Sequence, residues 1–197
     1  AASSSNFPVD LTGNVDIVNK NEKRYEVRNV DYTCYEEDIY VGYRYFDSFG
    51  KRVSYPFGYG LSYTTFEYGN PVIKNENAVY TVTVDVKNVG NRTGKEVVQL
   101  YVAAPDSKAM NKPEKELKAF AKTKELKPGE IATVSRTVNA ADLASYNEAA
   151  SSWIVDAGVY KFLVGASSRD IKATLAASSV KTNDLLKLTK EMNILKR

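Results

Sequence analysis

Within residues 78–87, apolar and polar residues alternate from Tyr80 to Lys87, a pattern that few backbone conformations can accommodate. The apolar positions share one face of an extended chain, and they are Tyr80, Val82, Val84 and Val86. A period of two with one apolar face is typical of a β-strand that buries one side. The sequence therefore predicts a half-buried strand here. A turn is expected at residues 88–91, where Asn and Gly tolerate positive φ.

Similar stretches recur on both sides of this strand. Further strands are predicted at residues 66–74, 96–104, 116–122, 131–138, 159–166 and 170–176. On the strand of residues 96–104, Val98, Leu100 and Val102 face one way. About seven short strands within roughly 110 residues are the signature of an immunoglobulin-like sandwich. We therefore expect an all-β fold, an immunoglobulin-like (fibronectin type III-like) β-sandwich.

Three aromatic residues refine this expectation. Tyr160, shortly before a predicted strand, is placed to form a tyrosine corner by bonding its hydroxyl to backbone upstream. Phe162 occupies the position where antibody domains place a cysteine, which favours a fibronectin type III-like variant without the disulfide. Trp153, the only tryptophan, is expected to pack at a sheet edge or core rim rather than to bind a ligand.

Composition excludes several kinds of chemistry. The 197 residues contain no histidine and one cysteine, Cys34, so Ser-His-Asp catalysis, imidazole zinc sites and an internal disulfide are impossible within the chain. We expect no metal and no cofactor. With 27 basic and 24 acidic residues the chain lacks the basic excess of a nucleic-acid binder, and no apolar run approaches about 18 residues, the length of a membrane span.

The chain divides into three regions by composition. Residues 1–66 hold 7 basic and 9 acidic residues, and ten of the 14 tyrosines lie between Tyr25 and Tyr68. Residues 67–178 contain the predicted strands, and residues 179–197 form a lysine-rich tail with several leucines. The first region is expected to be a largely irregular extension. The start at Ala1, without an initiator Met or a signal-peptide pattern, is expected of a processed or partial chain.

Two clusters in or near the first region could carry chemistry. Glu36-Glu37-Asp38 is the only dense acidic run, but adjacent residues on an extended segment point to opposite faces, so a solvated edge is expected. An aromatic block could be either a sugar-stacking platform or a packing surface. Its members are Tyr40, Tyr43, Tyr45, Phe46, Tyr55, Phe57, Tyr59 and Tyr63.

Three other motifs have ordinary structural interpretations. Pro56-Phe57-Gly58-Tyr59-Gly60 has the wrong spacing for a phosphate-binding loop, so its glycines are expected to allow tight turns. Asn91-Arg92-Thr93 fits the N-glycosylation pattern but is expected to be a plain turn. A lysine-rich stretch with interspersed glutamates is expected to be a solvated surface. Its lysines are Lys108, Lys112, Lys115, Lys118, Lys122, Lys124 and Lys127.

Long blocks of the chain resemble glycoside hydrolase family 3 over residues 30–178. Residues 40–47 (YVGYRYFD) and 55–66 (YPFGYGLSYTTF) resemble the junction between the family's α/β sandwich domain and its C-terminal module. Residues 86–90, 96–102, 115–120, 126–130, 159–168 and 170–171 are similar to its fibronectin type III-like domain. The resemblance thus assigns residues 1–66 to the end of the α/β sandwich domain and the linker, and residues 67–178 to the module.

The resemblance also implies what the chain lacks. Family 3 enzymes are retaining glycosidases, commonly β-glucosidases and β-xylosidases, and a retaining mechanism needs two carboxyl groups about 5 Å apart. Both family motifs lie upstream of the blocks present here, so no catalytic residue can be carried over and the substrate-binding residues stay unknown. The expected function is that of a non-catalytic module that supports the catalytic domains of a β-glucosidase. The alternative is a carbohydrate- or surface-binding module, against which the Thr, Asp and Lys on the outer face of residues 78–87 argue.

Expected partners follow from the same resemblance. They are the catalytic domains of the parent chain and, through them, a β-glucoside or oligosaccharide. The aromatic block would line the joint between domains, and without those domains the exposed rings would favour self-association. Residues 104–113 would reach toward the active site of the intact enzyme. The resemblance further suggests a periplasmic or secreted parent.

Overall fold

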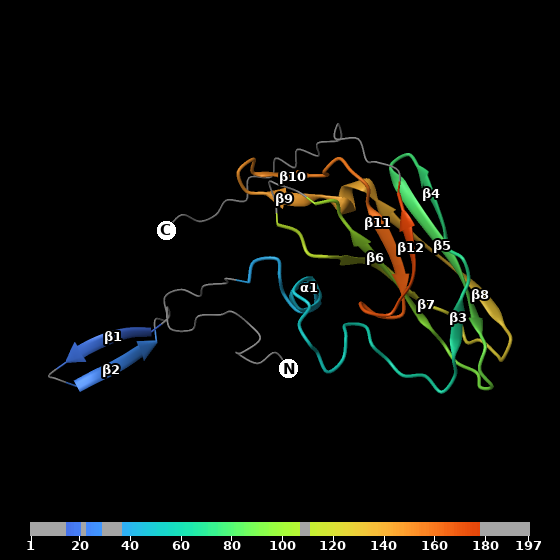
Figure 1. Ribbon diagram of the computed structural model, residues 1–197, viewed down its shortest axis with the longest axis horizontal. Helices are drawn as coiled ribbons and strands as arrows, with labels where there is room; N and C mark the ends of the chain where they lie inside the picture. The colour runs from blue at the N-terminus through green and yellow to red at the C-terminus, as the bar shows by residue number, and fades with distance from the viewer. Residues whose placement is uncertain (1–14, 21–22, 29–36, 107–110, 178–197) are drawn as a thin grey trace.

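The computed structural model describes residues 15–20, 23–28, 37–106 and 111–177, and its centre is a sandwich of two antiparallel sheets (Figure 1). The first sheet contains β3 (Phe66–Tyr68), β4 (Val72–Glu76), β5 (Val79–Asn88) and β8 (Ile131–Asn139). The second has the order β12-β11-β6-β7, formed by Ile171–Ala176, Lys161–Gly165, Val97–Ala103 and Glu116–Lys122. The predicted all-β fold is confirmed.

The smaller elements lie outside the two sheets. They are the hairpin of β1 (Val15–Lys20) and β2 (Lys23–Arg28), the helix α1 (Tyr43–Ser48), a 3-10 turn (Ala140–Leu143), and the hairpin of β9 (Ser145–Asn147) and β10 (Ser152–Ile154). The extension that was expected to be largely irregular thus contains the β1–β2 hairpin and α1. The β9–β10 hairpin was not expected from the sequence. None of the helices in the described part is long and apolar enough to cross a membrane.

The strand predicted at residues 66–74 is divided in two. β3 and β4 both pair with β5, with Tyr68 opposite Val86 and Val72 opposite Thr83. Between them runs Gly69-Asn70-Pro71, and the Gly69 N–H donates to the Asp85 carbonyl over 2.8 Å. The division is consistent with Pro71, which has no N–H to donate to a ladder.

The core lies between the sheets, as the alternation predicts. Tyr80, Val82, Val84 and Val86 of β5 are at most 4% exposed, and they pack with apolar residues of β6, which are Val98, Leu100 and Val102. Phe162 is fully buried, its ring centroid 5.1 Å from that of Tyr80. The Tyr160 hydroxyl donates to the Asp156 carbonyl over 3.1 Å, so the predicted tyrosine corner is confirmed. Burial raises the pKa of Tyr160 to about 12, which keeps this donor protonated.

The turn at residues 88–91 is present for a different reason than the one expected. Gly90 does not have positive φ; instead, a Cβ at this position would lie 2.8 Å from the Thr65 backbone N. Asn88 is fully buried, and its side-chain amide donates to the carbonyls of Arg92 (2.7 Å) and Leu126 (2.8 Å). Its Oδ1 accepts from the Thr64 hydroxyl over 2.7 Å. The residues therefore join three chain segments instead of supplying left-handed backbone.

Candidate functional site

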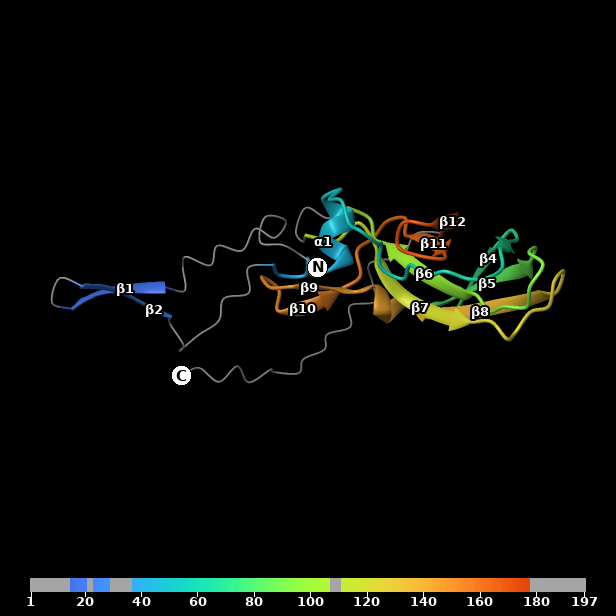
Figure 2. The same cartoon turned by 90° about the horizontal axis from the view of Figure 1, so that it is seen from below.

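Strand β6 is buried on both faces, which strand alternation did not predict. Gln99 and Tyr101 point away from the core, yet they are only 4% and 0% exposed. They are covered by chain preceding the sandwich, a stretch of residues 37–63 that we call the docked segment. Its helix α1 lies beside this sheet in both views (Figures 1 and 2).

Tyr43 of α1 links the docked segment to two strands. Its ring stacks on Phe57 at 4.6 Å between centroids and meets the edge of Tyr101 at 5.9 Å. Its hydroxyl accepts from the Leu117 N–H of β7 over 2.8 Å. This part of the aromatic block is thus a packing surface. Burial, with the nearby Tyr43 and Asp47 adding to it, raises the pKa of Tyr101 well above its ordinary value.

Asp47, near the end of α1, is the main electrostatic anchor of the docked segment. Its carboxylate is 4% exposed and lies 2.6 Å from the Arg169 Nε and 3.5 Å from the Lys115 Nζ. Arg169, in the turn between β11 and β12, also donates to the carbonyls of Phe46 (3.1 Å) and Lys51 (2.7 Å). One arginine therefore binds the side chain near the end of the helix and two carbonyls around it.

The lysine-rich stretch is not uniformly solvated, which corrects the sequence interpretation. The Lys112 and Lys115 side chains are each only 8% exposed, and both form ion pairs, Lys112 with Asp156 and Lys115 with Asp47. The Lys112 carbonyl also accepts from the Tyr40 hydroxyl over 3.2 Å. Lys124, by contrast, is 63% exposed, as expected of a solvated lysine. Lys108 lies outside the described residues.

A third contact joins the glycine-rich motif to β6. The Gln99 side-chain amide donates to the carbonyls of Gly58 (3.1 Å) and Ala166 (2.7 Å), and the Ser168 N–H donates to the Phe57 carbonyl over 2.9 Å. Gly58 has φ +80°, so the expected tight turn is confirmed at this glycine.

Several other aromatic residues of the docked segment are exposed, although Tyr45 of α1 is buried. Tyr55 is 71% and Tyr63 93% exposed, while Phe57 and Tyr59 are each close to half exposed. Val41, Phe49 and Leu61 add further exposed apolar surface. A cavity of about 380 Å³ opens beside these residues, between α1 and residues 52–57. The aromatic block thus has one packed part and one uncovered part.

The described part of the acidic run Glu36-Glu37-Asp38 does not have the extended backbone that was expected from the sequence. Glu36 lies outside the described residues, and Glu37 and Asp38 lie in a turn in which the Tyr40 N–H donates to the Glu37 carbonyl over 2.9 Å. Asp38 has φ +51° and is exposed. The expected extended edge is therefore wrong here, although the expected solvent exposure of Asp38 is confirmed. The Asn91-Arg92-Thr93 triplet lies in a bend between β5 and β6, as predicted.

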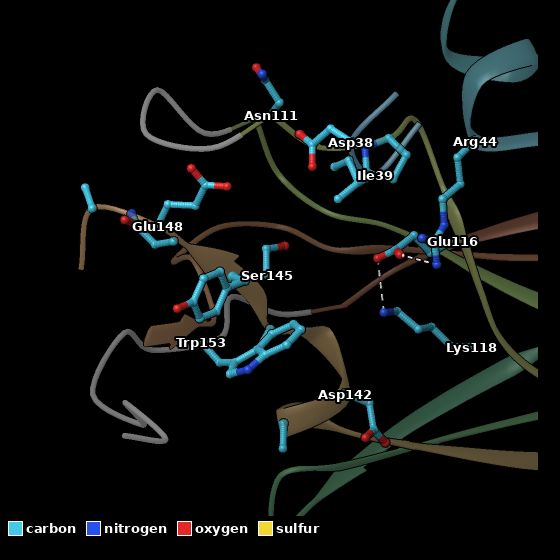
Figure 3. A pocket seen from close by; sticks show the side chains of 16 residues that line it. Asp38, Ile39, Arg44, Asn111, Glu116, Lys118, Asp142, Ser145, Glu148 and Trp153 are labelled. Atoms are coloured by element: carbon cyan, nitrogen blue, oxygen red, sulfur yellow. Dashed lines mark hydrogen bonds and ion pairs between the residues drawn. The ribbon is translucent and has the colours of Figure 1, made fainter. Parts of the chain in front are cut away.

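A larger cleft lies on the other side of α1. Its volume is about 750 Å³, and it is lined by the start of the docked segment, residues 111–118 and the β9–β10 hairpin. Glu116 on one side binds Arg44 (3.0 Å) and Lys118 (3.1 Å) (Figure 3). Trp153 also lines the cleft and is 43% exposed, so its packing at the rim of the sandwich is only partial. Within the described ranges no group of three His, Cys, Asp or Glu residues is placed to hold a metal ion.

Glu96, just before β6, gives the chain a pH-dependent stability. Burial raises the pKa of its carboxyl group, while its Oε1 accepts from the Val97 N–H over 2.9 Å. Because the folded pKa exceeds the unfolded one, the folded state binds the proton more tightly, and stability falls as pH rises through the folded pKa. Glu96→Gln keeps the acceptor and removes the charge, so we expect a higher melting temperature at pH 7 and a smaller difference from wild type at pH 4.

Thermal denaturation followed by circular dichroism at both pH values measures this effect. Glu125→Gln is the matched control, because Glu125 is exposed and should leave the pH dependence unchanged. A Glu96→Gln melting temperature equal to or below that of wild type at pH 7 would contradict the role assigned to burial.

The family model for the fibronectin type III-like domain matches residues 96–168. The chain is 40% identical over 192 residues to thermostable β-glucosidase B of Acetivibrio thermocellus, a match that covers 95% of this chain and 24% of that protein. Among solved structures, β-glucosidase 3B of Thermotoga neapolitana in complex with glucose superposes with a TM-score of 0.70 at 50% identity, over 74% of this chain and 20% of the other. A GH3 β-glucosidase of Bifidobacterium adolescentis gives 0.69 at 40% identity, over 73% and 21%.

The chain thus spans no more than about a quarter of the relatives that it matches. The matches include the docked segment as well as the sandwich, because they extend well beyond the residues of the domain model. The order of strands, the docked segment and these similarities together identify the chain as the C-terminal, fibronectin type III-like portion of a family 3 glycoside hydrolase.

Proposed function

We propose that this chain is a non-catalytic structural module of a retaining β-glucosidase, and that it buttresses the catalytic domains of its parent. The observation that carries the proposal is the docked segment. Residues 37–63 are fixed to the sandwich by the Asp47 ion pairs, the Tyr43 hydroxyl and the amide of Gln99. A segment that belongs in sequence to a preceding domain but packs on the module would couple the two mechanically.

We propose the domain boundaries on the same basis. Residues 1–66 would form the end of the α/β sandwich domain and the linker, residues 67–178 the fibronectin type III-like domain, and residues 179–197 a separate tail. The residues matched by the domain model, 96–168, fall within the second of these. The tail lies outside the described residues, which end at Ala177 after β12.

The uncovered aromatic and aliphatic side chains of the docked segment would be the surface that the catalytic domains cover. Leu61 and Tyr63 are 88% and 93% exposed, and such clustered apolar exposure is typical of an interface. The parent's substrate would be a β-glucoside or related oligosaccharide, bound by those domains. In the isolated chain a second copy would be the substitute partner. Sedimentation velocity should then show concentration-dependent dimers that Leu61→Asp abolishes.

Two measurements test the proposed function. An immunoblot of source cells with antibodies against this chain should detect a product several-fold larger than 21.9 kDa. The purified chain should hydrolyse 4-nitrophenyl β-glucoside no faster than a buffer control. A native product of 21.9 kDa would overturn the assignment to a larger enzyme. Turnover by the isolated chain at the rate of an intact glucosidase would overturn the non-catalytic role.

A further inference from the structure

The β9–β10 hairpin presents an aromatic pair to solvent. Trp153 and Tyr146 are opposite each other in the register, with ring centroids 5.5 Å apart and planes at 63°. They are 43% and 48% exposed. The chain on either side is anchored in the core by Leu143 (3% exposed) and Val155 (6% exposed). Because these anchors hold the hairpin in place, its fold does not require the rings of Trp153 and Tyr146 to stay half exposed. Two neighbouring aromatic rings that remain half exposed are typical of a binding surface.

The pair lies in the wall of the 750 Å³ cleft, a volume within the range of sites for small molecules. Three separate parts of the chain contribute polar groups around it, namely the turn at Asp38, the stretch beginning at Asn111 and the hairpin residue Glu148. In Figure 3 Glu148 and Glu116 lie on opposite sides of the cleft, and Trp153 lies across it from Asp38 and Asn111. Hydrogen-bonding groups therefore surround an aromatic face.

The charge of the cleft selects among ligands. The Glu116 carboxylate is shared by Arg44 and Lys118, so these three groups are largely satisfied by one another. The side-chain carboxylates of Asp38 and Glu148, in contrast, form no hydrogen bond or ion pair with any residue that the structure describes. Toward the described residues, these two carboxylates are therefore unpaired acceptors with negative charge. Such a lining repels phosphates and acidic sugars and can accept hydrogen bonds from neutral hydroxyl groups.

The arrangement of the rings distinguishes a sugar from an organic cation. A quaternary ammonium ion is bound by aromatic faces arranged as a cage. Here one ring meets the other at an edge, so the two faces do not converge on a single point. An aromatic side chain that lines a cleft together with carboxylate and amide groups instead suits a pyranose ring, whose C–H face is apolar and whose rim carries hydroxyls.

We propose that this cleft binds a neutral oligosaccharide, with one pyranose ring stacked on Trp153 and its hydroxyls donating to Asp38 and Glu148. The site lies on the hairpin end of the sandwich and not on the outer face of β5, where Thr and Asp gave no support for sugar binding. It does not depend on the proposed role as a structural module, since the cleft is formed wholly by this chain.

The single tryptophan makes the test direct, because all tryptophan emission of the 197-residue chain reports on this cleft. Titration with cellotetraose should give a saturable change in emission with a dissociation constant on the order of 1 mM. Tyr146→Ala should weaken binding about tenfold by removing the ring that supports Trp153. Glu148→Ala, at an exposed position that cannot disturb the core, should weaken it several-fold. Tyr63→Ala, on the exposed part of the docked segment, is the control and should leave binding unchanged.

Choline and tetragalacturonate serve as cationic and anionic probes in the same titration. Saturation by choline without any response to cellotetraose would overturn the proposal in favour of a cation site. A response to tetragalacturonate stronger than that to cellotetraose would overturn the charge argument. Absence of a saturable response to cellotetraose up to about 20 mM, or equal binding by wild type and Glu148→Ala, would also overturn it.

Discussion

Replacing Asp47 with alanine should lower the free energy of unfolding by about 3 kcal/mol, because it leaves buried positive charge without its partner. The Lys115 side chain is 8% exposed, and its remaining ion-pair partner is Glu114, which is 57% exposed. Arg169 would keep its hydrogen bonds to the carbonyls of Phe46 and Lys51 but would lose the carboxylate 2.6 Å away. Urea denaturation measures the loss. Hydrogen exchange should show residues 37–63 losing protection before the sandwich does.

A second variant tests whether uncompensated charge causes the loss. Combining Asp47→Ala with Lys115→Met removes both charges, and it should recover part of the stability because no buried cation is left alone. Lys124→Ala is the control, since its ion pair with Glu130 is exposed to solvent and should contribute little to stability. If Asp47→Ala costs no more than this control, the ion pairs do not hold the docked segment to the sandwich.

Phe162→Ala should destabilise the sandwich by about 4 kcal/mol, the largest effect expected of any single truncation here. Phe162 is fully buried between the sheets, beside Tyr80. In the ladder it is opposite Val102 on β6 and Leu175 on β12, so it lies on one of the two central strands of its sheet. Removing the ring forfeits its burial and leaves a cavity that two rigid sheets can close only in part.

The same substitution at an exposed strand position is the matched control for this prediction. Phe120 on β7 is 64% exposed, and Phe120→Ala should change the free energy of unfolding by no more than about 0.5 kcal/mol. Chemical denaturation of both variants gives the comparison. Similar losses in the two would mean that Phe162 does not occupy the core position assigned to it.

The local pattern of the sequence was sufficient to predict most strands of the sandwich. The strand at residues 116–122 was predicted with the bounds observed, β8 extends one residue further than predicted, and β5 is shifted by one residue at both ends. Tyr160 and its corner could be predicted because the donor and acceptor are four residues apart. Period-two alternation is a local property, so it reports reliably which side of a strand faces its own core.

The candidate sites depended on contacts that no local pattern encodes. Gln99 and Tyr101 are buried on the outer face of β6 because a segment some 40 to 60 residues earlier covers them. Lys115 is buried because Asp47, far away in the chain, lies beside it, whereas sequence alone suggested solvated lysines. Trp153 was assigned to packing, and only the tertiary structure revealed that it lines a cleft with Asp38 and Asn111.

The sequence by itself determined most of the strands, the buried face of β5 and the tyrosine corner, because each follows from residues within a few positions of one another. Only the tertiary structure decided which strands are also covered on their outer face, which charged side chains are buried and which aromatic rings remain exposed to solvent. The physical reason is that alternation records burial on one side of a strand. Burial of the other side depends on which distant segment packs there. The residues adjacent in sequence to the contacting side chains show no pattern that predicts this contact.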